Sequence, residues 1–460
     1  MTINEVKEQI KASSARAVVE KAIAAAKNVA DYNALLSLTE DRALERADAV
    51  DQGKITGRLA GVPYVVKDNF LAFGGPTTAA SHMLEFFDTP LQATAVEKLE
   101  AEGAICIGKS NLDAFAHGGS TENSAYGPTK NAIDPTCVAG GSSGGSAVIT
   151  ALNVVPFALG SDTGGSIRQP SSYNGVVGVK PTYGTVSRYG VVAMASSTDT
   201  IGSITSNVED AEFVMDILAG RDDRDMTTLP DYFEVQTSVK PSQKIGLIKD
   251  FMTEHVDSEV RARVNEYVEK LKAAGHTVEE VSLPMAEYAL AIYYIIVPAE
   301  LSSNLARYDG IRYGHRAEGV KTLAELYGRT RNQGFETENK RRIMIGSYVL
   351  SSGFFDAYYL QAQKARTLLI NEFNKLFATY DCLIGPVAPS TAFRLGENTA
   401  DPIKMYLEDI MTVPASLAGV PAISVPAGVS DKGMPIGVQI IGPNKSDAQL
   451  LALAKSVENK

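Results

Sequence analysis

Cysteine is scarce in this sequence. Its 460 residues include only three cysteines, Cys106, Cys137 and Cys382, which lie far apart and lack the spacing of metal ligands. A disulfide framework and a zinc site are therefore not expected, and we predict no bound metal. The same scarcity favours a reducing compartment.

Long apolar runs are missing as well. The longest, around Tyr288 to Pro298, is too short to span a bilayer. The first stretch, MTINEVKEQIKASSARAVVEK (1–21), is charged and amphipathic and lacks the apolar core of a signal peptide. We therefore expect a soluble, cytoplasmic protein that is not attached to a membrane.

Positive charge is not in excess. The chain has 43 Lys and Arg residues against 54 Asp and Glu residues, a net charge of −11 and a pI near 5.2. Such a chain lacks the broad basic surface that holds RNA or DNA, so any nucleic acid is expected on a partner. Hydrophobic residues make up 45%, which is enough for a large core and argues against disorder.

The order of the expected elements is typical of an α/β protein. Apolar spacing predicts helices over residues 1–50, including one from Asn33 to Ala49. Strands and helices then alternate, and because helices lie between strands we expect a largely parallel, buried sheet. The expected strands are 64–66, 104–107, 154–159, 176–179, 245–248, 277–281, 382–385, 422–425 and 436–441. The stretch from 284 to 378 is expected to be mostly helical.

Three short segments carry the candidate chemistry: GVPYVVKDN (61–69), GGSSGGSA (140–147) and GSDTGGSIRQP (160–170). Small residues let a backbone approach closely, and consecutive glycines after a strand can present N–H groups to an oxyanion. Each segment alone also has an ordinary interpretation. Lys67 fits a solvated strand end, the second segment a linker, and Ser166 a helix cap.

A serine nucleophile needs a base. None of the five histidines, His82, His117, His255, His276 and His315, lies within the two Gly/Ser segments, although a histidine-based triad remains open because distant residues can meet in the fold. A neutral lysine can replace histidine. Its pKa must then fall by roughly 3 units from about 10.4, a cost of about 4 kcal/mol. Burial without a carboxylate partner acts in that direction.

Two other motif matches are rejected. Residues 103–110, GAICIGKS, fit the phosphate-loop pattern, but their variable positions are apolar and predict a strand. Residues 140–144, GGSSG, fit the nucleophile elbow, which must follow a strand. Asn131, Asp134 and Pro135 precede it and are poor strand formers.

Taken together, the three segments resemble the amidase signature family, which has a strand-end lysine and then these two Gly/Ser segments in this order. The resemblance implies an α/β fold with a large twisted mixed β-sheet covered by helices on both faces. It also implies amide hydrolysis through an acyl-enzyme. Ser166 would be the nucleophile, Ser142 would relay the proton from a cis peptide, and Lys67 would be the base. The N–H groups of Thr163, Gly164, Gly165 and Ser166 would form the oxyanion hole.

The same resemblance implies a single amidase domain over residues 1–460. Its four parts are N-terminal helices (1–55), the signature core (56–225), a strand–helix–strand unit with a helical insertion (226–380), and C-terminal strands and a helix that complete the core (381–460).

A narrower resemblance covers nearly the whole chain. Segments 120–131, 177–202, 298–314, 340–366 and 412–428 are similar to the glutaminase (A) subunits of tRNA-dependent amidotransferases. This implies that the chain hydrolyses glutamine and passes ammonia through a tunnel to a B subunit, which amidates Glu-tRNA(Gln) and/or Asp-tRNA(Asn). A small C subunit would complete the heterotrimer. No cofactor is expected in this chain, since ATP and Mg²⁺ would bind the partner, as would most of the tRNA.

Free glutamine carries an α-carboxylate and an α-ammonium, which a selective site holds with a guanidinium and a carboxylate. The resemblance places such groups at Arg342, Asp409 and Tyr293, although Arg341 could replace its neighbour and all could be ordinary helix residues. The chain departs from these subunits at His117 and Gly119, where Met and Ser are commoner. A stand-alone amidase acting on another small amide is the alternative function, and a catalytically inactive scaffold is a third.

Overall fold

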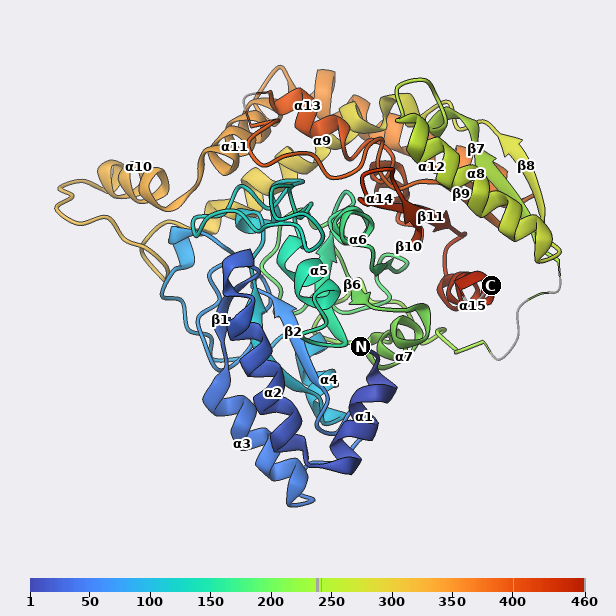
Figure 1. Cartoon of the computed structure of the whole chain (residues 1–460). Helices are drawn as coiled ribbons and strands as arrows, with labels where there is room; N and C mark the ends of the chain where they lie inside the picture. The colour runs from blue at the N-terminus through green and yellow to red at the C-terminus, as the bar shows by residue number, and fades with distance from the viewer. Residues whose placement is uncertain (237–239, 241, 400, 459–460) are drawn as a thin grey trace.

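The computed structural model describes residues 1–236, 240, 242–399 and 401–458 (Figure 1). Their core is one mixed sheet of eleven strands in the order β1-β3-β2-β4-β6-β5-β10-β11-β9-β7-β8. The strands are β1 (Leu35–Leu38), β2 (Pro63–Lys67), β3 (Ile105–Ser110), β4 (Phe157–Asp162), β5 (Val177–Lys180), β6 (Thr200–Thr205), β7 (Lys244–Ile248), β8 (Thr277–Val281), β9 (Cys382–Pro386), β10 (Ala422–Val429) and β11 (Pro435–Ile441).

The strand directions correct one expectation. Among the described residues four strand pairings are parallel and six are antiparallel, so the sheet is mixed rather than largely parallel. Parallel pairs form where a helix crosses over, as between β7 and β8. The centre is built differently, from the β10–β11 hairpin and from β5 and β6, whose connection contains no helix. The mixed α/β fold implied by the resemblance is thus confirmed.

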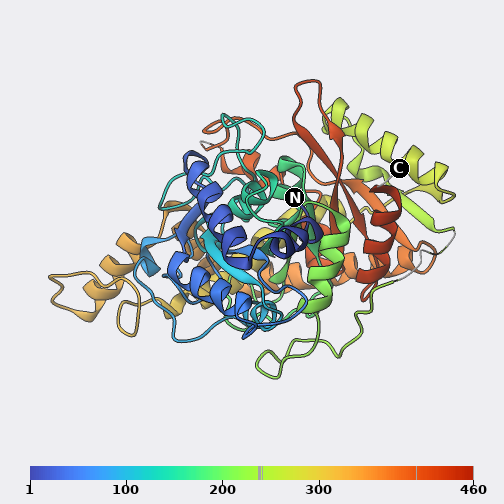
Figure 2. The same ribbon diagram turned by 60° about the horizontal axis from the view of Figure 1, so that its bottom comes forward.

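Helices cover both faces of the sheet. The α-helices are α1 (Ile3–Ala12), α2 (Ala15–Asn28), α3 (Glu40–Asp51), α4 (Thr94–Ala101), α5 (Gly144–Ala151), α6 (Arg168–Asn174), α7 (Val208–Leu218), α8 (Ser258–Ala273), α9 (Ala286–Asn304), α10 (Leu323–Gly334), α11 (Thr337–Val349), α12 (Leu360–Phe377), α13 (Pro402–Leu407), α14 (Val413–Ala418) and α15 (Asp447–Glu458). Helix α10 and its flanking loops extend away from the body in both views (Figure 1, Figure 2).

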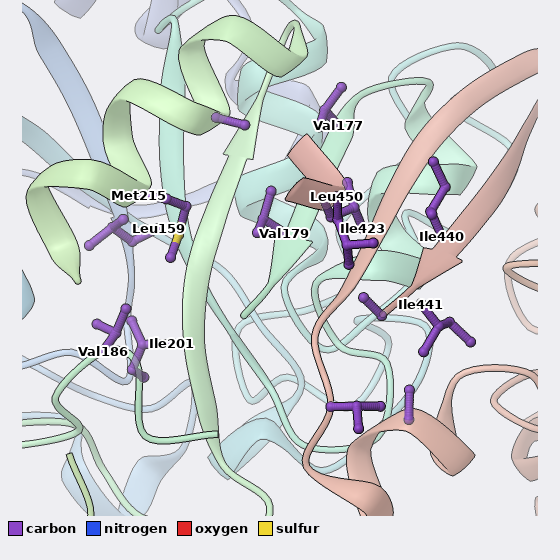
Figure 3. Close-up of a cluster of buried hydrophobic side chains, with 14 of the residues drawn as sticks. Leu159, Val177, Val179, Val186, Ile201, Met215, Ile423, Ile440, Ile441 and Leu450 are labelled. Atoms are coloured by element: carbon purple, nitrogen blue, oxygen red, sulfur yellow. The ribbon is translucent and has the colours of Figure 1, made fainter. Parts of the chain in front are cut away.

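Strand β2, which ends at Lys67, is buried on both faces. Successive side chains of a strand point to opposite faces. Val65 accordingly packs with α2, α3 and α5, whereas Tyr64 and Val66 belong to the main core cluster. Figure 3 shows the continuation of that main cluster, where side chains of β4, β5, β6, β10 and β11 meet Met215 of α7 and Leu450 of α15. A lysine at the end of such a strand is held deep inside the protein.

The predicted helix from Asn33 to Ala49 is wrong over its first half. Leu35–Leu38 forms β1 and pairs antiparallel with β3, and helix α3 begins only at Glu40. Asn33 has a left-handed backbone (φ 50°), and the Thr39 N–H donates to the Ile107 carbonyl. Tertiary pairing with a neighbouring strand therefore overrides the helical spacing of these residues. The other expected strands are found within a few residues of their predicted positions.

The apolar run around 288–298 belongs to a longer helix than the sequence indicated. Helix α9 continues through a 3₁₀ turn to Arg307, and this 22-residue stretch is long and apolar enough to cross a membrane by length and composition alone. Half of its 18-residue apolar window is buried within the protein. It packs against α11, α12 and α14, as the core helix of a globular protein does. In α11, Gly346 permits close contact, because a Cβ there would lie 1.8 Å from the Pro298 carbonyl oxygen.

Candidate active site

Lys67 lies at the centre of a ring of serines. Its Nζ donates to Ser142 Oγ (2.8 Å), Ser143 Oγ (2.9 Å) and Ser161 Oγ (3.0 Å), and the side chain is fully buried. It forms no ion pair with any described carboxylate. Burial lowers the pKa of Lys67 to about 7, and the more distant charges of Asp113 and Asp162 only partly oppose this. A substantial neutral fraction near pH 7 makes Lys67 suited to accept a proton.

The structure brings Ser142 to this lysine and places the segment of Ser166 next to it. Ser142 follows a cis peptide bond with Gly141, as the resemblance implies, and stands just before α5. Ser166 lies in the turn between β4 and α6 and is 8% exposed. The Ser143 N–H donates to the Ser166 carbonyl oxygen (3.0 Å), which fixes the two segments side by side. The segment that carries Ser166 therefore lies directly beside the segment whose Ser142 is bonded to Lys67.

A buried ion pair shapes the turn that carries Ser166. Arg168 Nε and Nη2 donate to the two oxygens of Asp162 at 3.0 and 3.1 Å, and both side chains are fully buried. Arg168 also donates to Ser416 Oγ (2.8 Å) and Gln439 Oε1 (3.1 Å). These four groups tie the turn to α14 and β11, so the C-terminal strands complete the site built by the Gly/Ser segments.

The proposed oxyanion donors are not equivalent. The Gly165 N–H donates to Asp162 Oδ1 at 2.9 Å, and the carboxylate therefore occupies it. Within the described residues, the N–H groups of Thr163, Gly164 and Ser166 have no acceptor. Of the four proposed donors, these three are free to meet an oxyanion, whereas the Gly165 N–H is already engaged. Gly165 instead supplies the positive φ of the turn (142°), where a Cβ would strike Thr412 Oγ1.

A guanidinium stands beside this centre. Arg342 is 4% exposed and is held over the rings of Tyr294 (5.1 Å) and Tyr406 (5.5 Å), while its Nε donates to Glu338 Oε1 (2.8 Å). The Arg341 side chain is 42% exposed and also pairs with Glu338. Burial and preorganisation therefore favour Arg342 over Arg341 as the carboxylate-binding residue.

Asp409 and Tyr293 lie on the inner side of the same region. A Cβ at Gly119 would lie 3.4 Å from Asp409 Oδ2, and a Cβ at Gly164 would lie 2.8 Å from the Tyr293 hydroxyl oxygen. Burial raises the pKa of the Asp409 carboxyl well above its usual range, against the opposing charge of Arg342. A cation bound beside Asp409 would restore its charged form.

A pocket opens between the loop 113–123 and helices α11 and α13. Asp113, His117, Gly119, Arg342 and Tyr406 are among its lining residues, whereas Lys67, Ser142 and Ser166 are not. Gly119 connects the pocket to these residues. Its carbonyl oxygen accepts from Gln169 Nε2 (2.8 Å), and Gln169 Oε1 accepts from the Gly141 N–H (2.9 Å), which links the pocket to the segments of Ser142 and Ser166.

Sequence reasoning missed several contributors to the site. Ser143 and Ser161 lie within the quoted motifs, yet their bonds to Lys67 were not expected. Glu338 could have been found by its spacing of four from Arg342 on a helix. The stacked rings of Tyr294 and Tyr406, 4.0 Å apart, come from distant segments and have no signal in the sequence.

Lys109, in the rejected phosphate-loop match, is the penultimate residue of β3. It is fully buried, contacts Asp68 at 3.0 Å and donates to the Pro76 carbonyl oxygen (2.8 Å). These contacts hold the chain that follows Lys67. A phosphate could not approach this amine, so the rejection is confirmed.

Comparisons with known proteins show the family of the chain. The family model described as Amidase matches residues 17–451. The chain belongs to the amidase signature family. More particularly, it is 51% identical to the A subunit of glutamyl-tRNA(Gln) amidotransferase from Thermosynechococcus vestitus over 434 residues, 93% of this chain and 90% of that protein.

Solved structures give the same grouping. The crystal structure of the A subunit of glutamyl-tRNA(Gln) amidotransferase from Thermotoga maritima is 38% identical, with a TM-score of 0.83 over 100% of this chain and 94% of that one. A bacterial aryl acylamidase of the amidase signature enzymes has a TM-score of 0.87 over 100% and 96% of the two chains, but its identity is 26%.

Replacing Arg168 by Met tests the ion pair. The change leaves the buried Asp162 carboxylate without its guanidinium, and we expect a loss of about 3–5 kcal/mol in the free energy of unfolding, measured with urea. Arg221→Met is the control, because its pair with Asp223 is exposed and should contribute less than about 1 kcal/mol. Equal effects of the two variants would show that the turn does not depend on the pair.

The pH profile of amide hydrolysis tests Lys67. If neutral Lys67 is the base, kcat/KM should be low below its pKa of about 7 and rise as pH increases through that value. Lys67→Met should lower kcat at least about 100-fold. Lys180 is equally buried with a pKa of about 7 but donates to the Pro181 carbonyl oxygen outside the serine ring. Lys180→Met should retain the rise near pH 7. An unchanged profile in a still active Lys67→Met variant would exclude Lys67 as the base.

Proposed function

We propose that this protein is the glutaminase component of a tRNA-dependent amidotransferase. It hydrolyses glutamine and supplies ammonia for converting Glu-tRNA(Gln) to Gln-tRNA(Gln) and/or Asp-tRNA(Asn) to Asn-tRNA(Asn). The observation that carries the hydrolytic part is the buried Lys67 amine, which is bonded to Ser142 and has no carboxylate partner in the described part of the chain. The assignment to the amidotransferase follows the identity to its A subunits over most of both chains.

The proposed reaction begins when neutral Lys67 accepts the Ser142 hydroxyl proton while Ser142 takes the proton of Ser166. The Ser166 oxygen attacks the side-chain amide carbon of glutamine, and the free N–H groups of Thr163, Gly164 and Ser166 stabilise the resulting oxyanion. Lys67 then returns its proton through Ser142 to the leaving nitrogen. Ammonia departs, and a glutamyl ester remains on Ser166. Water cleaves this ester by the same proton route and releases glutamate.

Recognition of glutamine uses its two α-substituents. Arg342 would bind the α-carboxylate, and Asp409 would bind the α-ammonium with Tyr293 packed beside the reacting turn. The ordered guanidinium and the raised pKa of Asp409 support this division, because Arg342 shares Glu338 with Arg341 and Asp409 has no ion-pair partner among the described residues. A zwitterionic amide supplies both missing partners.

An assembly with B and C subunits forms the second part of the proposal. Nine large apolar and aromatic side chains between Met344 and Leu368 are each at least 36% exposed, on α11, the connection 350–354, the π-helix Phe355–Tyr359 and α12. Monomeric proteins rarely gather so many, and this α11–α12 patch supports a chain that works within a complex. ATP and Mg²⁺ would act on the partner, and the complex would be cytoplasmic.

The alternative is a stand-alone amidase acting on another small amide. The fold permits it, since the aryl acylamidase superimposes as well as the amidotransferase A chain from Thermotoga maritima does. The buried Arg342 and nearby Asp409 argue for an amino-acid amide instead.

Ammonia release from glutamine distinguishes the two functions. The purified chain should release ammonia slowly when alone and much faster with B and C subunits, charged tRNA and ATP, and Ser166→Ala should abolish release in both cases. Fast, partner-independent release from simple amides, with glutamine a poor substrate, would establish the stand-alone amidase.

Arg342→Ala tests substrate recognition. Loss of a charge-assisted contact of about 1.5–3 kcal/mol predicts a rise in the KM for glutamine of about 10- to 100-fold. Arg341→Ala is the matched control and should change KM less than about threefold, because its exposed pair contributes little. Steady-state kinetics of both variants decide this. The assignment fails if the two variants behave alike.

A further inference from the structure

His117 occupies the wall of the pocket and is not used by the mechanism above. It is fully buried, although it lines the pocket together with Arg342. Its Nδ1 lies 2.5 Å from Asn339 Nδ2, and Asn339 is three residues before Arg342 on α11. Residues at this spacing share a face of a helix. His117 is therefore bound to the same helix face that presents the guanidinium.

The hydrogen bonds assign the proton of the imidazole. Asn339 Nδ2 also donates to the Ala114 carbonyl oxygen (2.9 Å), so this atom must be the amide nitrogen rather than its oxygen. His117 Nδ1 then accepts from it, and a neutral ring carries its proton on Nε2. Burial and the charge of Arg342 lower the pKa of His117 well below its usual range, which keeps the ring neutral. Among the described residues His117 Nε2 has no hydrogen-bond partner.

We propose that the His117 Nε2–H is a substrate-binding donor that, with Arg342, holds the α-carboxylate of the amino-acid amide. A buried donor without a partner is costly, and a carboxylate in the pocket would satisfy it. A neutral imidazole can stand beside a guanidinium without charge repulsion, so the two donors can converge on one anion. This inference rests on the proposed glutamine specificity.

Two substitutions separate the roles of the two ring nitrogens. Glutamine at 117 places an amide N–H near the Nε2 position, whereas asparagine reaches only the Nδ1 position and can accept from Asn339. We expect His117→Met and His117→Asn to raise the KM for glutamine about 10-fold or more with kcat nearly unchanged. We expect His117→Gln to recover most of the loss. With 4-aminobutanamide, which lacks the carboxylate, kcat/KM should be the same for all four proteins.

The experiment uses the assembled enzyme, with thermal unfolding as a check that each variant is folded. Recovery by Asn but not by Gln would overturn the proposal and assign His117 to holding Asn339 alone. Wild-type kinetics in every folded variant, while Arg342→Ala still raises KM, would also overturn it. No ammonia release from glutamine by the wild-type assembly would instead contradict the proposed function itself.

Discussion

The ion pair between Asp162 and Arg168 is the constraint on which the site depends. It closes the turn that carries Ser166, occupies the Gly165 N–H, and reaches Ser416 and Gln439 on the C-terminal elements. An internal charge pair contributes little net stability compared with apolar packing, but it is strongly destabilising when one partner is lost. The ion pair matters here for its geometry. Asp162 pairs with Arg168 rather than with Lys67, and Lys67 is left with hydroxyl partners.

Burying Lys67 consequently costs free energy, because its protonated form is disfavoured. A pKa lowered from 10.5 to about 7 corresponds to about 5 kcal/mol of disfavoured protonation at 1.36 kcal/mol per unit. The fold sustains this cost because β2 lies in the interior of the sheet with both faces packed, and the adjacent Asp68 is already paired with Lys109. Asp68 and Asp162 are thus each paired with a basic residue other than Lys67. The serine ring can then exchange protons with an amine for which no described carboxylate competes.

The sequence predicted the parts of this arrangement that are local. Lys67 at a strand end, the two Gly/Ser segments and the strand–helix–strand unit at 244–281 all follow from short-range pattern. Parts that depend on distant pairing were not predictable: β1 is extended only because β3 lies beside it, and the centre of the sheet is antiparallel because β10 and β11 return from the far end of the chain. Likewise, residue spacing could not separate Arg341 from Arg342, which differ in burial.

The charged groups near the pocket, Arg342 and Asp409, differ in their electrostatics from Lys67 in the serine ring. Burial lowers the pKa of Lys67 to about 7, whereas Arg342 remains charged through Glu338 and the faces of Tyr294 and Tyr406. The charge of Arg342 is therefore permanent. The raised pKa of the nearby Asp409 carboxyl makes the charge of Asp409 depend on its surroundings. A substrate that brings both an anion and a cation stabilises the two together. A simple amide brings neither, so it gains contact with the reacting turn but leaves Asp409 without a compensating cation.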